Sequence, residues 1–156
     1  MRGHLAAALS YRTPGAIGEA LPGDWCFVQL WGNLGVISPT VECFLGIEPD
    51  AGRRTLRVVP NLPADWGFAE VKRLRVGATN VDIRVQRDHD TTTISINGAQ
   101  DFELTLGVVL RTDETVEMFL VNDQPVAWQM EERNVGSCAT CVVKGQANIN
   151  VTVKTS

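Results

Sequence analysis

Strict alternation of apolar and polar residues dominates this chain from residue 55 onward. Because successive side chains of a β-strand point to opposite faces, each alternating run predicts a strand with one buried and one hydrated face. Turn residues such as Asn97-Gly98 and Asn122-Asp123 separate the runs. Recurrence at about ten residues is typical of an antiparallel sandwich or barrel. The clearest runs are 81–86, 94–97, 102–106, 116–120 and 149–154.

The first third of the chain has a different character. Residues 1–48 carry only six of the 32 charged side chains. Residues 26–37 read as a helix, and Ser38 with Pro39 resembles the start of a second helix that ends near Leu45. Helices this apolar on every side are normally buried inside something larger. We therefore predict a mainly β fold, with a helical segment over 1–48 followed by an antiparallel β-sandwich over 49–156.

Composition excludes several function classes. The net charge of −4 leaves no basic surface for nucleic acid or an anionic membrane. The longest apolar stretch, 26–47, is interrupted by polar residues and falls short of a membrane span. Residues 1–10 show no convincing cleavage pattern, so we expect no signal peptide. Four cysteines in 156 residues are too few for a disulfide scaffold, which favours a cytoplasmic protein.

Cys138 and Cys141 form a Cys-x-x-Cys motif. A zinc site would need two further ligands, and none of the remaining Cys or His residues shows paired spacing. The flanking residues predict a strand, on which positions i and i+3 face opposite sides. We therefore interpret the motif as structural and expect no metal and no cofactor. His89 lies in a predicted hairpin loop, where we expect it to be solvated.

Glu19 is the only carboxylate between residues 1 and 23, and it lies in the Pro- and Gly-rich loop 14–22. A carboxyl group among apolar residues can have a raised pKa and act as a general acid or base. The alternative is a solvated loop residue. Gln29 and Asn33 share one face of the predicted helix, where two amides either pair with a neighbouring helix or line a polar cavity.

The four tryptophans also admit two interpretations. Aromatic rings pack on the apolar faces of sugars, but tryptophans are more often core or interface residues. Trp66 and Trp128 are the candidates for an exposed platform, although both stand beside predicted turns.

Two motifs resemble one family. They are Cys26-x-x-Gln29-x-Trp31 and the junction Gly46-Ile47-x-Pro49-Asp50, Leu56, Pro60-x-Leu62-Pro63 and Trp66. Together they resemble the end of the barrel and the start of the C-terminal β-sandwich in six-hairpin (α/α) barrel glycoside hydrolases, above all the amylo-α-1,6-glucosidase (glycogen-debranching-like) enzymes. The runs 74–77 and 81–84 resemble the strands that follow. The similarity covers residues 14–97 well and 98–156 loosely.

The resemblance implies roles for particular residues. Glu19 matches the position of the catalytic base, and Gln29 and Trp31 match residues that line the sugar pocket, with Asn33 on the helix face of Gln29. The reaction implied is inverting hydrolysis, in which a second carboxyl protonates the leaving oxygen. That acid would come from an earlier barrel segment, and most of the barrel helices are absent from these 156 residues.

Three functions remain open on the sequence. The first is a C-terminal fragment or accessory domain of a glycoside hydrolase that is not catalytic alone. Its full enzyme would act on an oligo- or polysaccharide, and the missing barrel would belong either to the same longer protein or to a partner chain. The second is a non-catalytic carbohydrate-binding module. The third is a structural module that forms a homo-oligomer through the apolar stretch 26–45.

Overall fold

The computed structural model describes residues 37–156. The chain divides into two compact units, Met1–Glu42 and Cys43–Ser156. The second unit holds two β-sheets, and this confirms the predicted mainly β, sandwich-like fold. Its first strand begins at Ile47. No helix within residues 37–156 is long and apolar enough to cross a bilayer.

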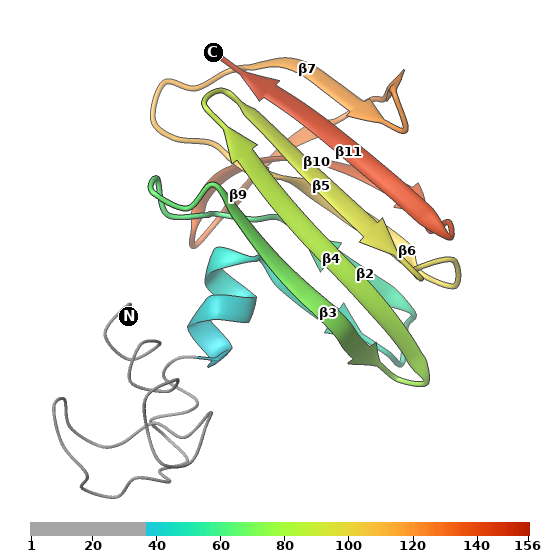
Figure 1. The fold of residues 1–156 in the computed structure, drawn as a ribbon. Helices are drawn as coiled ribbons and strands as arrows, with labels where there is room; N and C mark the ends of the chain where they lie inside the picture. The colour runs from blue at the N-terminus through green and yellow to red at the C-terminus, as the bar shows by residue number, and fades with distance from the viewer. Residues whose placement is uncertain (1–36) are drawn as a thin grey trace, which may run out of the picture. The chain divides into compact units, whose positions relative to one another are not determined.

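Two sheets make up the described structure (Figure 1). Sheet A has the strand order β1 (Ile47–Asp50), β2 (Thr55–Val58), β6 (Glu103–Val109), β10 (Gly136–Lys144) and β9 (Gln129–Arg133). Sheet B has the order β3 (Phe68–Val76), β4 (Thr79–Asp88), β5 (Thr91–Asn97), β11 (Asn148–Thr155), β7 (Val116–Val121) and β8 (Gln124–Pro125).

The five alternating runs are all strands, namely β4, β5, β6, β7 and β11. The predicted turns also form. His89 joins β4 to β5 with a φ of 48° and is exposed, as expected. Asn122 and Asp123 join β7 to β8 with φ values of 49° and 62°. Asn and Asp tolerate this left-handed conformation, which two-residue hairpin loops require.

The core lies between the inner faces of the sheets. On β4, β5, β6 and β11 the apolar side chains at every second position are buried, as the alternation predicts. They include Leu104 and Leu106 on sheet A and Ile83, Ile94 and Val151 on sheet B. On β7 the predicted face is wrong, because Phe119 and Val121 are buried while Met118, one of the alternating apolar residues of the run 116–120, is 36% exposed. The two sheets therefore share one hydrophobic interior, and what distinguishes them is on their outer faces.

Two features differ from the prediction. The sandwich is not wholly antiparallel, because β2 and β6 pair in parallel, with Leu56 opposite Leu104. The chain builds three strands of sheet B between β2 and β6, so it re-enters sheet A in the same direction. The predicted helix over 38–45 is present as a π-helix, η1 (Pro39–Phe44). The earlier predicted helix, 26–37, lies outside the described residues except for its last position.

Candidate functional site

The four site residues predicted from the sequence are Glu19, Gln29, Trp31 and Asn33. All of them lie outside the described residues 37–156, so their roles stay predictions. The junction motif that supports those roles is described in full.

Gly46 is required by the backbone at the start of the sandwich. Its φ is +59°, a conformation that side chains with a Cβ rarely adopt. A Cβ at this position would also overlap the carbonyl oxygen of Val59. The two backbones are close because the Val59 amide donates a hydrogen bond to the Gly46 carbonyl at 3.0 Å. The glycine of the junction is thus explained by close packing of two segments.

The next junction residues shape the β1–β2 hairpin. Pro49 cannot donate a backbone hydrogen bond, and β1 is an edge strand, where such a loss is tolerated. One carboxylate oxygen of Asp50 accepts a hydrogen bond from the Arg53 amide at 3.0 Å, which tightens the turn. Leu56, on β2, is fully buried in the core. These residues serve the fold and carry no chemistry of their own.

The last part of the junction is held against Phe44, the last residue of the π-helix. The Asn61 amide donates to the Phe44 carbonyl at 2.9 Å. The rings of Phe44 and Trp66 meet edge to face, with centroids 5.6 Å apart and an angle of 77° between their planes. Trp66 is half-buried in this contact. Of the two candidate platforms, Trp66 therefore packs within the junction, while Trp128 is 40% exposed.

A cluster of four charges lies on the outer face of sheet A. The Arg57 side chain is only 12% exposed, and its Nη2 donates to Oε1 of Glu131, which is 29% exposed. Arg57 Nε also lies 3.7 Å from Glu48 Oε1. Arg133 Nη2 donates to both carboxylate oxygens of Glu48, at 2.9 and 3.1 Å. Each carboxylate is thus met by a guanidinium, an arrangement that suits a structural role better than proton transfer.

The Cys-x-x-Cys motif lies beside this cluster, on β10. Cys138 pairs with Val109 on the outer face, and Cys141 pairs with Leu106 on the inner face. The two thiols therefore point to opposite sides of the sheet, as the spacing predicts, and both are free and buried. Burial raises the pKa of Cys141 to about 11. Burial also raises the pKa of Cys138, an effect that Arg57 opposes. Within residues 37–156 no group of side chains is suited to hold a metal.

A hollow of about 210 Å³ opens where β9 begins. None of its lining residues carries a charge, and they come from the start of β9 and the middle of β10: Ala127, Trp128, Gln129, Thr140, Cys141 and Val142. Val142 is 55% exposed, whereas Thr140 is fully buried. The Thr140 hydroxyl has no hydrogen-bond partner in the part of the chain that the structure describes. The sequence pointed to Trp128 but gave no signal for Thr140 or Gln129, because strand pairing brings them together.

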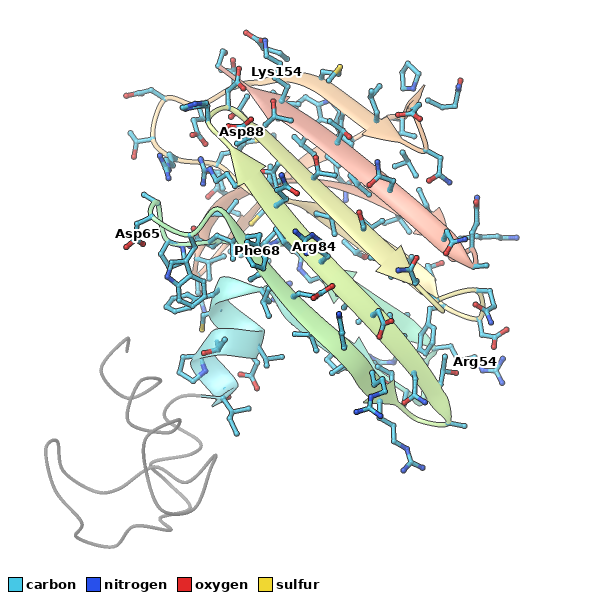
Figure 2. All side chains as sticks on the ribbon, viewed as in Figure 1. Arg54, Asp65, Phe68, Arg84, Asp88 and Lys154 are labelled. Carbon is cyan, nitrogen blue, oxygen red and sulfur yellow. The ribbon has the colours of Figure 1, made fainter. Side chains whose placement is uncertain are left out.

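Short polar side chains form the outer face of sheet B along most of β5 and β11. Ser95 on β5 donates to Asn150 on β11 at 3.0 Å. At the other side of the sheet, Phe68 is 57% exposed and the Arg84 guanidinium carbon lies 4.7 Å from the centre of its ring. Figure 2 shows these two side chains together on β3 and β4.

Comparison with known proteins gives one structural neighbour and no sequence relative. No protein-family model matches the chain, and no curated protein matches it. The solved structure of α-L-rhamnosidase from Dictyoglumus thermophilum is similar, with a TM-score of 0.55 and 16% sequence identity. The similarity covers 80% of this chain and 14% of the rhamnosidase chain. At this identity the likeness establishes a shared fold, and the matched region is a small part of the larger protein.

Proposed function

We propose that this chain is the C-terminal portion of a glycoside hydrolase: an accessory β-sandwich, joined to the last helices of a catalytic barrel and not catalytic by itself. The observation that carries the proposal is the fold, which most of the chain shares with a small part of an enzyme named as a glycoside hydrolase. The junction motif supports it independently, because its residues resemble the corresponding junction of a glycosidase family.

The debranching-like resemblance supplies the finer proposal. Glu19 acts as the base that activates water, Gln29 and Trp31 line the sugar pocket with Asn33 beside them, and a carboxyl from the missing barrel acts as the acid. An inverting pair stands about 6.5–9.5 Å apart to admit that water. The carboxylates of Glu48, Glu131 and Glu114 in the described sandwich are engaged by arginines, which fits a scaffold role. We propose an α-glucosidic substrate, with an α-L-rhamnoside as the alternative.

The test measures hydrolysis of the aryl α-glucoside and the aryl α-L-rhamnoside. The chain alone should release no product above the blank. When it is joined to or mixed with the barrel encoded next to it, activity should appear, and Glu19→Gln should abolish it. Glu48→Gln is the matched control, since it removes a carboxylate of the sandwich and should leave turnover unchanged. Turnover by the chain alone that survives Glu19→Gln would overturn the proposal.

A reducing, cytoplasmic location belongs to the same proposal. It is supported by the three described cysteines, Cys43, Cys138 and Cys141, which are all free thiols. Disulfides are rare in reducing compartments. Thiol titration of the unfolded chain purified under air-free conditions should find four reactive thiols, and a disulfide in that sample would count against this location.

A further inference from the structure

We propose that the hollow beside Trp128 is a binding site for a single neutral sugar ring, separate from the catalytic site placed at Glu19. The inference rests on the proposed function only for its choice of ligand class. The site itself is argued from three observations on the outer face of sheet A: an exposed indole, an uncharged hollow, and a buried hydroxyl with no partner.

The hydroxyl of Thr140 is the strongest of these observations. A buried polar group without a hydrogen bond costs about 1–3 kcal/mol, so such groups are rare and call for an explanation. Thr140 faces outward between Gly107 on β6 and Gln129 on β9. A Cβ built at Gly107 would lie 2.9 Å from the methyl carbon of Thr140, so this methyl group lies against Gly107. The hydroxyl therefore faces away from that neighbour.

The remaining groups of the hollow suit a sugar. The Trp128 indole is large, flat and 40% exposed, and aromatic rings of this kind pack on the apolar face of a sugar. The exposed Gln129 amide offers both a donor and an acceptor, and the Thr140 hydroxyl offers the same. Val142 adds an apolar wall that is 55% exposed. Because the Thr140 hydroxyl is buried in the sugar-free chain, binding requires the hollow to open so that a sugar hydroxyl takes the place beside it.

The size and the lack of charge of the hollow limit which ligands can bind there. The hollow of about 210 Å³ is smaller than the roughly 300–1,000 Å³ of typical pockets for larger ligands, which indicates one ring. The lining carries no charged side chain to pair with a carboxylate or a phosphate. We therefore expect neutral hexoses and deoxyhexoses to bind, and sugar acids or sugar phosphates to be excluded.

The experiment titrates the full chain with methyl α-D-glucoside and methyl α-L-rhamnoside, followed by two-dimensional NMR and calorimetry. A ligand of this size should bind with a dissociation constant on the order of 1 mM. Resonances of Trp128 and Thr140 should move together. Trp128→Ala should weaken binding about tenfold or more, and Trp128→Phe should retain part of the affinity because it keeps an aromatic face.

Phe68→Ala is the matched control, because it removes an aromatic ring that is 57% exposed, more than Trp128 at 40%, from the outer face of sheet B. It should leave the dissociation constant unchanged. Thr140→Val gives a second readout. It should weaken sugar binding about threefold while raising the melting temperature of the sugar-free chain, since it removes an unpartnered hydroxyl at constant volume.

Three results would overturn the site. One is the absence of spectral change up to roughly fifty times the expected dissociation constant. Another is an equal loss of affinity in Trp128→Ala and Phe68→Ala. The third is a concentration-dependent dimer that Trp128→Ala abolishes, which would assign the hollow to contact between copies of the chain. A failure of this kind leaves the hydrolysis test of the proposed function standing, and a failure of that test leaves sugar binding measurable.

Discussion

The two outer faces of the sandwich differ although the inner faces are alike. On sheet B the outer face follows the usual rule for an antiparallel sheet, with threonine, serine and asparagine side chains in water. On sheet A the outer face contains fully buried residues, Cys138 and Thr140, beneath a charge cluster on one side and the Trp128 hollow on the other. The difference shows that sheet A has a second packed layer, formed by its own long side chains.

The largest loss of stability is expected from substitutions in the core, and it should be common to both sheets. Leu104→Ala removes a fully buried side chain from sheet A, and Ile94→Ala removes one from sheet B. Each should lower the free energy of unfolding by about 2–5 kcal/mol, because a large-to-small change leaves a cavity. Urea unfolding with a common slope would measure both. If only one substitution were costly, the single shared core would be wrong and the sheets would be stabilised separately.

Alkaline pH should destabilise sheet A through Cys141. Burial raises the pKa of Cys141 from an ordinary 9.0 to about 11. Below pH 9 the thiol is protonated in the folded and in the unfolded chain, so the free energy of unfolding is at its full value. Between pH 9 and 11 the unfolded chain loses this proton while the folded chain keeps it, so the free energy of unfolding falls. The loss should be on the order of 2 kcal/mol. Urea unfolding across this range should show a steeper decline than in Cys141→Ala, and identical slopes would contradict the assignment.

The charge cluster on sheet A should contribute more to the free energy of unfolding than the exposed cation–π pair on sheet B. Arg57→Met leaves Glu131 partly buried without its guanidinium and should cost about 1–2 kcal/mol. The matched change on sheet B, Arg84→Met, removes a cation from the exposed Phe68 ring and should cost at most about 0.5–1 kcal/mol. Chemical denaturation of both variants, with Arg57→Met/Glu131→Gln to close a double-mutant cycle, measures the difference. Equal costs would remove the distinction between the two faces.

The smallest effect on stability is expected at Asp90, in the exposed turn between β4 and β5 of sheet B. A hydrogen bond from Thr91 lowers the pKa of Asp90 below its ordinary 3.8, with a further contribution from Lys154. The stabilisation is present above pH 3.8 and is lost as the pH falls through the lowered pKa. Asp90→Asn should therefore reduce the melting temperature slightly at neutral pH and not at all in strong acid. Scanning calorimetry of both proteins on either side of pH 3.8 would test this, and a constant difference would refute it.

The sequence predicted sheet B better than sheet A for the same physical reason. Strands with one wet face alternate, and the runs that became β4, β5 and β11 were recognised from that pattern. In β10, residues Cys138–Cys141 are all buried because both faces are covered, so no alternation remains to be read. The parallel pairing of β2 with β6 leaves no local trace, since it depends on where the chain returns after three strands of the other sheet.

The candidate site residues also differ in whether the sequence could predict them. The roles of Glu19, Gln29, Trp31 and Asn33 came from resemblance to a family and stay predictions. Trp128 was noted because tryptophan is conspicuous in any sequence. Thr140 was not, because a threonine is unremarkable until strand pairing places it beside Gln129 and Gly107 and leaves its hydroxyl buried. A site assembled by long-range register cannot be found from spacing along the chain.

The parallel β2–β6 pair has a consequence for the order of folding. Strands β3, β4 and β5 are neighbours both in the sequence and in sheet B, so they can form as hairpins at little cost in loop-closure entropy. In sheet A, β2 can pair with β6 only after β6 has been made, and β6 gains its other neighbour only when β10 pairs with it. Contacts between such distant segments form slowly. During synthesis, the meander of sheet B is therefore available early, whereas the Trp128 hollow comes into existence only when β10 has docked.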